Sequence, residues 1–108
     1  MNVVCPECNK SVDFAAVFDG AFCWAQSSIA FRCPNCRTPA HFTPRGNETE
    51  VGFLGAGTPL DTIEGIRYPI QVATRQEGDS LTIQWGALRR TLPSAHSYVA
   101  ASASQHGL

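Results

Sequence analysis

The chain has 108 residues, of which 44% are hydrophobic, and its formal net charge at pH 7 is −1. Such a weak charge argues against non-specific nucleic-acid binding, which normally requires a clearly basic surface. No stretch approaches the roughly 18 apolar residues of a membrane span, and the start MNVVCPECNK lacks the basic lead and apolar run of a signal peptide, so we expect a soluble, cytoplasmic protein.

Four of the five cysteines form two C-P-x-C pairs, Cys5 with Cys8 and Cys33 with Cys36. In a reducing compartment, paired cysteines favour metal ligation over disulfides. Zinc takes four thiolates tetrahedrally and then has no open position for a reactant. We therefore predict that these four cysteines bind one structural zinc ion. Zinc binding to small domains contributes about 10–16 kcal/mol, so without metal the first part of the chain is expected to be unfolded or molten.

Three other interpretations of the same cysteines stay open. Iron in a rubredoxin-like electron-transfer site uses a similar ligand spacing, although the surrounding aromatic and glycine pattern is missing. The cysteines can also be buried apolar residues or form disulfides. A redox-active C-x-x-C pair requires a thioredoxin-like βαβ setting, which the sequence does not indicate.

The sequence around the first cysteine pair is repeated around the second. Residues 3–14 and 31–42 both read apolar-x-C-P-x-C-x-x-x-apolar-x-Phe. The alternation of apolar residues is that of half-buried strands, so two similar strand-turn-strand units are expected to face each other across the metal. Directly after each pair the chain tends toward positive φ, which Asn9 tolerates better than Arg37.

Residues 3–42 resemble a prokaryotic zinc ribbon of the C-P-x-C…C-P-x-C type. The resemblance implies structural zinc on Cys5, Cys8, Cys33 and Cys36. It specifies the metal but not the biology, because ribbons of this kind occur in transcription factors, ribosomal proteins, enzyme appendages and small adaptors. Residues 45–108 carry no recognised family pattern.

The remaining elements are predicted from turn residues and alternation. Asp19-Gly20 marks a turn, residues 22–31 suit a long strand, and the polar residues 43–50 indicate a linker. Residues 58–65 suit one helical turn. Residues 66–74 alternate as a half-buried strand that Pro69 places at a sheet edge or interrupts.

A returning strand is predicted over residues 81–85, after a turn at residues 77–80, and residues 89–92 continue it beyond a bulge at Gly86. The expected fold is mainly β. A zinc ribbon over residues 1–44 is followed by an antiparallel hairpin or small sheet over residues 45–93 and a flexible tail over residues 94–108. Tyr68 and Trp85 are expected in a shared core.

The cysteine and histidines outside the four predicted ligands suit ordinary core or surface positions. Cys23 lies between aromatic residues and suits a small core position. His41 is a possible substitute ligand, or a partner of Cys23 in a nucleophilic pair, but its counterpart in the repeat is Asp13, which indicates an outward polar position. His96 and His106 are expected at the solvated surface.

Four arginines are candidates for an anion-binding or partner-binding patch. Arg67 and Arg75 are expected on the outward face of one strand, with Arg89 and Arg90 near its partner strand. Pairing of these arginines with acidic residues across the strands is the alternative. We expect a non-enzymatic interaction module without catalytic residues, with a protein as its partner or, alternatively, a nucleic acid.

Overall fold

The computed structural model describes residues 1–54 and 64–96. These residues form antiparallel sheets and one short helix, which confirms the prediction of a mainly β protein. The elements in chain order are β1 (Asn2–Val4), β2 (Ser11–Asp13), α1 (Phe14–Asp19), β3 (Cys23–Ala25), β4 (Ser28–Arg32), β5 (Pro39–Arg45), β6 (Glu48–Phe53), β7 (Ile66–Tyr68), β8 (Ala73–Glu77), β9 (Ser80–Trp85) and β10 (Leu88–Pro93).

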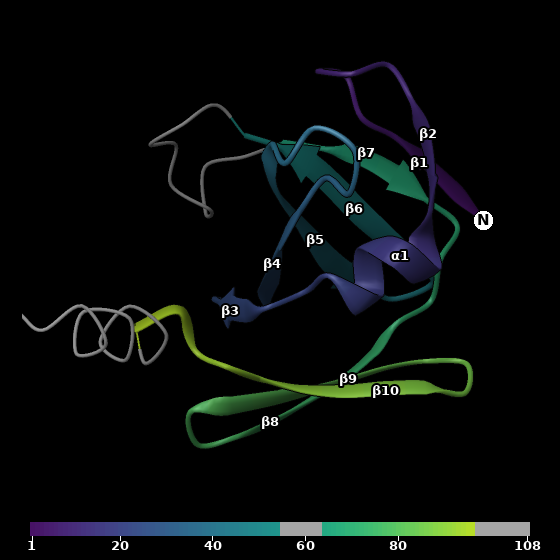
Figure 1. Cartoon of the computed structure of the whole chain (residues 1–108). Coiled ribbons are helices and arrows are strands. Elements are labelled where there is room, and N and C mark those ends of the chain that lie inside the picture. Colours follow the sequence, from purple (N-terminus) through teal and green to yellow (C-terminus); the bar gives the residue numbers. More distant parts are fainter. Residues whose placement is uncertain (55–63, 97–108) are drawn as a thin grey trace, which may run out of the picture.

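The described strands are arranged in three sheets (Figure 1). β1 and β2 form a two-stranded sheet, strands β3 to β7 form a five-stranded sheet in chain order, and β8, β9 and β10 form a three-stranded sheet with β9 in the middle. All pairs of strands within these sheets are antiparallel. Each sheet is therefore built mainly from hairpins between strands that follow each other in the chain.

Four of the hairpins turn within two residues. Gln26 and Ser27 both have positive φ, at 52° and 69°, which is the pattern of a type I′ turn. The other three turns begin with a glycine of positive φ: Gly46, Gly78 and Gly86. Glycine at the first position is typical of type II′ turns, whose twist matches that of the flanking strands.

These turns correct three of the expectations from sequence. The long strand over residues 22–31 is two strands, β3 and β4. The linker over residues 43–50 is wrong, because β5 and β6 run through it on either side of Gly46. The expected division at residue 44 thus falls inside β5. Gly86 is a hairpin turn and not a bulge, so residues 88–93 form a separate strand beside β9.

The predicted strand over residues 66–74 is interrupted at Pro69. An interruption was one of the two outcomes expected of this proline, and a position at a sheet edge was the other. β7 ends at Tyr68 and lies at the edge of the five-stranded sheet, whereas β8 begins at Ala73 and belongs to the three-stranded sheet. Thr49 donates a hydrogen bond to the carbonyl of Ile70 at 2.6 Å, which ties the connecting segment to β6. The turn at residues 77–80 is confirmed. Residues 58–63 and 97–108 lie outside the described part of the chain.

Helix α1 has no counterpart in the expectations from sequence. Its buried residues Phe14, Val17 and Phe18 have the i, i+3, i+4 spacing of one helix face. The helix ends where the amide of Gly20 bonds to the carbonyl of Ala16 at 3.0 Å. Six residues are too few for a stable isolated helix, so packing rather than propensity holds it.

The core lies between the five-stranded and three-stranded sheets, with α1 inserted at one side (Figure 1). The Phe14 ring contacts Phe42 of β5 and Trp85 of β9, with centroid separations of 5.3 and 4.9 Å. Trp85 and Tyr68 pack against this core as partly buried residues, in agreement with the prediction. In the described ranges, α1 included, no helix is long and apolar enough to cross a bilayer.

Candidate metal centre

The sulfur atoms of Cys5, Cys8, Cys33 and Cys36 lie within 4.8 Å of one another. The Cys5–Cys36 and Cys8–Cys33 sulfur pairs are separated by 3.7 and 3.8 Å. Around a tetrahedral ion with metal–sulfur bonds of about 2.3 Å, two ligand sulfurs lie about 3.8 Å apart. A disulfide requires about 2.05 Å. The arrangement therefore fits a tetrahedral metal ion, and all four predicted ligands are brought together.

Two turns of the same construction supply these ligands. In each turn, the residue after the second cysteine donates its amide hydrogen to the carbonyl oxygen of the first cysteine. The amide of that first cysteine donates to the carbonyl oxygen of the residue five positions later. The bonds are Asn9 to Cys5 at 2.8 Å and Cys5 to Lys10 at 3.1 Å, and Arg37 to Cys33 at 2.9 Å and Cys33 to Thr38 at 3.0 Å. The repeat seen in the sequence is thus a repeat of backbone geometry.

The predicted positive φ after each cysteine pair is present. Asn9 has φ of 57° and Arg37 has φ of 64°. A non-glycine residue there is strained, and arginine more so than asparagine, whose short side chain is often found in this region. Backbone hydrogen bonds between Arg37 and Cys33 and between Cys33 and Thr38 therefore hold the second turn in a conformation that arginine does not favour.

The strands next to the two turns also correspond. Val3 pairs with Val12 across β1 and β2, and the equivalent positions Phe31 and Ala40 pair across β4 and β5. Val3 and Phe31 are fully buried. The first turn lies at the end of the two-stranded sheet, whereas the second belongs to the five-stranded sheet, so in the described part of the chain only the second has further strands beside it.

The thiols of Cys5 and Cys36 differ strongly in their pKa values. Burial raises the pKa of Cys5 to about 12, although the amides of Glu7 and Cys8 oppose this. Hydrogen bonds from Thr38, whose hydroxyl lies 3.1 Å from the sulfur, lower the pKa of the exposed Cys36 to about 6. A divalent cation would have to displace the proton of Cys5, so metal uptake is coupled to proton release.

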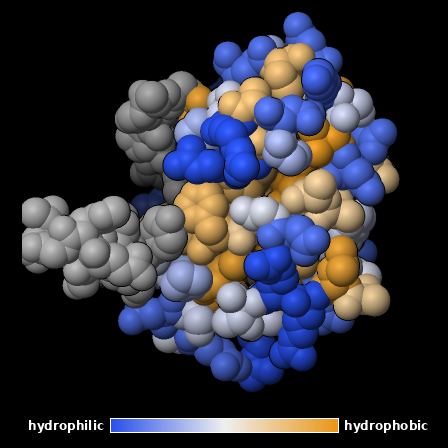
Figure 2. All heavy atoms as spheres, in the orientation of Figure 1, coloured by the Kyte–Doolittle hydropathy of each residue, from blue (hydrophilic) through white to orange (hydrophobic). Residues whose placement is uncertain are grey.

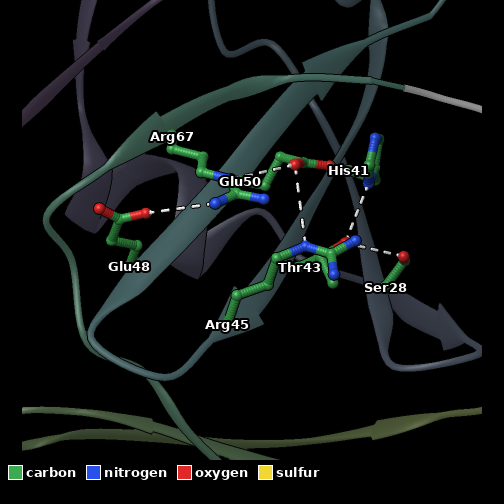
Figure 3. Close-up of polar contacts among 7 residues, drawn as sticks. All are labelled: Ser28, His41, Thr43, Arg45, Glu48, Glu50 and Arg67. Atoms are coloured by element: carbon green, nitrogen blue, oxygen red, sulfur yellow. Dashed lines mark hydrogen bonds and ion pairs between the residues drawn. The ribbon is translucent and has the colours of Figure 1, made fainter.

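His41 lies on β5 beside Ser28 and Thr43 (Figure 3) and is not part of the cysteine cluster. It was expected to point outward, but it is only 1% exposed, which corrects that expectation. Its Nδ1 lies 3.3 Å from the hydroxyl of Thr43, which in turn lies 2.8 Å from that of Ser28. Its Nε2 has no hydrogen-bond partner among the described residues. Burial lowers the pKa of His41, so the neutral ring is favoured.

Cys23 is buried, at 4% exposure, as expected of a core residue. Burial raises the pKa of its thiol, which opposes a nucleophilic role. Ala30 pairs with Cys23 on one side and with His41 on the other. One whole strand therefore separates the thiol from the imidazole.

The four candidate arginines are distributed over two sheets. Arg67 lies on β7, where it pairs with Glu50 at 3.7 Å and with Glu48 at 3.9 Å (Figure 3). Arg75 lies on β8 and pairs with Glu77 at 3.0 Å. Arg67 and Arg75 were expected on one strand, and the interruption at Pro69 makes that wrong. Arg67 pairs with acids across the strands, as in the alternative expectation, whereas Arg75 pairs with an acid of its own strand.

Arg89 and Arg90 point to opposite faces of β10. Arg90 donates hydrogen bonds to the carbonyl and carboxylate of Asp19, at 2.6 and 3.2 Å, and so joins β10 to α1. Arg89 lines a shallow hollow of about 200 Å³ together with Arg75 of β8. Only these two of the four arginines share a surface.

Comparison of the chain with protein-family models, curated proteins and solved structures finds no match. The assignment of residues 3–42 to the C-P-x-C zinc-ribbon type therefore stays a prediction. A group of four cysteines that can hold a metal ion in a small β protein is what the structure establishes. Of the two remaining histidines, His96 is exposed, as expected, and His106 lies outside the described residues.

Proposed function

We propose that this protein is a non-enzymatic interaction module that binds one structural zinc ion and recognises another protein. Four thiolates complete the coordination of zinc, so an ion held by these cysteines has no open position for a substrate. The raised pKa of Cys23 and the lowered pKa of His41 leave both groups neutral, which does not favour acid–base or nucleophilic work by this pair.

The observation that carries the proposal is a hollow beside the first cysteine turn, whose lining is mainly apolar and includes the acidic residue Glu64. The hollow has a volume of about 310 Å³ and is lined by Val4, Pro6, Phe53 and Ile66, among others. Val4 and Ile66 are two of the four large hydrophobic side chains that are exposed in the described residues, at 46% and 62%. Exposed apolar side chains gathered in one place are typical of protein-binding surfaces.

The metal and this hollow are structurally connected. Pro6 lies between the ligands Cys5 and Cys8, and Val4 directly precedes the first ligand. The amide of Val4 donates a hydrogen bond to the hydroxyl of Tyr68 at 3.2 Å, which joins β1 to β7. Zinc would thus hold one wall of the hollow against the other.

The proposal is tested with the zinc-loaded protein as bait in a comparison of three forms. Ile66→Asp introduces a charge into the hollow, whereas Leu88→Asp changes an exposed hydrophobic residue, at 39%, on the three-stranded sheet. A protein retained by the unchanged chain and by Leu88→Asp but lost with Ile66→Asp is the expected result. Its dissociation constant, measured with purified components, should rise at least tenfold with Ile66→Asp. Equal retention by all three forms would contradict the proposal.

Two measurements separate this function from its alternatives. Elemental analysis of the purified protein distinguishes zinc from iron, and a colourless protein argues against a rubredoxin-like electron carrier. Titration with DNA and RNA at low salt tests the nucleic-acid alternative. Strongly salt-dependent affinity that disappears with Arg75→Glu and Arg89→Glu would replace protein recognition by nucleic-acid binding.

A further inference from the structure

Strand β8 forms an uncovered edge of the three-stranded sheet. It pairs with β9 on one side, and on its other side no strand of the described residues pairs with it. All five of its residues are exposed. The opposite edge, β10, is covered, because the indole of Trp24 donates a hydrogen bond to the carbonyl of Leu92 at 3.1 Å and Trp24 forms a bridge to Ser94.

The backbone of β8 has hydrogen-bonding groups directed away from β9. Glu77 and Ser80 close the two-residue turn and face each other, and in such a hairpin the closing pair exchanges both hydrogen bonds. Because bonded pairs alternate along an antiparallel ladder, Thr74 and Gln76 direct their N–H and C=O groups to the free edge. Such an edge is a ready template for another strand.

The charges on β8 select which strand this edge accepts. Arg75 and Glu77 lie on the same face, two residues apart, and their side chains form an ion pair at 3.0 Å. Figure 2 shows that the lower margin of the molecule, where the three-stranded sheet lies, is mostly hydrophilic. An incoming strand therefore meets one positive and one negative charge and no large apolar surface.

We propose that β8 pairs antiparallel with β8 of a second copy of this chain, with Gln76 facing Gln76 of that copy. The two three-stranded sheets then become one six-stranded sheet. In this register Arg75 faces Glu77 of the second copy, and Glu77 faces its Arg75, so that four charges alternate in sign along and across the strands. Opposite charges in such cross-strand pairs stabilise a sheet, and like charges destabilise it.

Charge disfavours the two registers that are centred on Arg75 or on Glu77, and backbone hydrogen bonding excludes shifts by one residue. A register centred on Arg75 places the two arginines directly opposite each other, and one centred on Glu77 does the same with the two glutamates. Shifts by one residue would oppose groups directed to the free edge with groups already bonded to β9. The contact is short, so the dimer is expected to be weak and to depend on concentration.

This dimer is tested by sedimentation equilibrium or light scattering of the metal-loaded protein between micromolar and millimolar concentrations. The unchanged chain should be a dimer at the upper end. Arg75→Glu leaves only negative charges on this face of β8, and Glu77→Arg leaves only positive ones. Each variant should weaken the dimer at least about tenfold, because two attractive pairs become repulsive.

Mixing supplies the decisive comparison. The two single variants, each monomeric alone, should form a heterodimer when mixed in equal amounts, and Arg75→Glu combined with Glu77→Arg should restore the homodimer. Arg89→Glu is the matched control, since it reverses a charge on the same sheet away from the free edge and should leave the dimer intact. Near-UV circular dichroism checks that each variant is folded.

Three outcomes would overturn the proposal. A chain that stays monomeric up to millimolar concentration has no such contact. Dimers that persist in both single variants use another surface. Single variants that become monomeric without rescue by mixing or by the double exchange place β8 in the contact but exclude the register centred on Gln76.

Discussion

Removing the metal from the reduced protein is expected to release the hairpin formed by β1 and β2, while most of the five-stranded sheet stays folded. The structure thus narrows the expectation from sequence that the whole first part of the chain unfolds. The two cysteine turns have the same backbone geometry but different surroundings. Among the described strands, β1 and β2 have only each other as partners, whereas β4 and β5 also pair with β3 and β6. The two halves of the repeat should therefore respond differently to the same loss.

The stability that the hairpin lacks without metal is estimated from its ordering entropy and its buried side chains. Ordering about a dozen residues costs about 12 kcal/mol at about 1 kcal/mol each. Val3 and Val12 are the buried residues of these two strands, and their burial returns about 3–6 kcal/mol. The deficit of about 6–9 kcal/mol is offset by the about 10–16 kcal/mol that a structural zinc ion contributes. Without metal the hairpin has no comparable source of stability.

The measurement is hydrogen exchange by mass spectrometry, before and after chelation under reducing conditions. Residues 1–13 should lose their protection, while residues 39–53, which hold β5 and β6, should keep most of theirs. Cys8→Ser should reproduce the pattern in the presence of zinc, and Cys23→Ala, which changes a cysteine outside the cluster, should not. Uniform loss over the whole chain, or unchanged protection of residues 1–13, would refute this reasoning.

Three further predictions concern residues outside the metal centre. Burial holds the pKa of His41 below its ordinary value, so the unfolded chain takes up a proton more readily than the folded one. The free energy of unfolding should therefore be highest above about pH 6.5 and decline as the pH falls toward the pKa of the folded state. His41→Asn should flatten this decline in denaturant titrations, and an identical pH dependence would contradict the assignment. Trp24→Phe removes the hydrogen bond to Leu92 and should lower the free energy of unfolding by about 1 kcal/mol; an unchanged midpoint in urea would show that this bond contributes nothing. A Cβ atom at Gly65 would collide with the backbone of Val51, so Gly65→Ala should destabilise the protein by at least about 1–3 kcal/mol, and a melting temperature equal to that of the unchanged chain would rule out this close approach.

The cluster of four cysteines was predictable because its signal is local and chemical. Two cysteines separated by two residues can reach one ion through a single tight turn, whatever the rest of the chain does. The sequence repeat also indicated the register of the strands, because equivalent apolar positions pair across each turn. The positive φ of Asn9 and Arg37 followed from the same geometry.

The sheet through residues 43–50 was missed because its polar side chains resemble those of a linker. Arg45 and Glu50 pair at 3.7 Å, and Arg67 joins them from β7. The useful signal was Gly46-Asn47, a dipeptide that favours a two-residue hairpin turn. Charged strands of this kind are stabilised by their neighbours across the sheet, which a single sequence does not reveal.

The break at Pro69 shows another limit of periodicity. Alternation of apolar and polar residues continues from Ile66 to Thr74, yet the residues on either side of the proline belong to different sheets. Periodicity reports which side of a strand is buried and not which neighbour buries it. Helix α1 was missed for a related reason, since its six residues are shorter than the window that a helical pattern requires.

The different surroundings of the two cysteine turns also bear on the proposed protein-binding hollow. One wall, Val4 and Pro6, belongs to the hairpin that is expected to unfold without metal, and the other, Phe53 and Ile66, belongs to the five-stranded sheet. The chelated protein should therefore lose affinity for its partner under conditions in which near-UV circular dichroism still reports a packed aromatic core. Binding that survives chelation while residues 1–13 are unprotected would place the partner elsewhere, because the hollow cannot exist without its first wall.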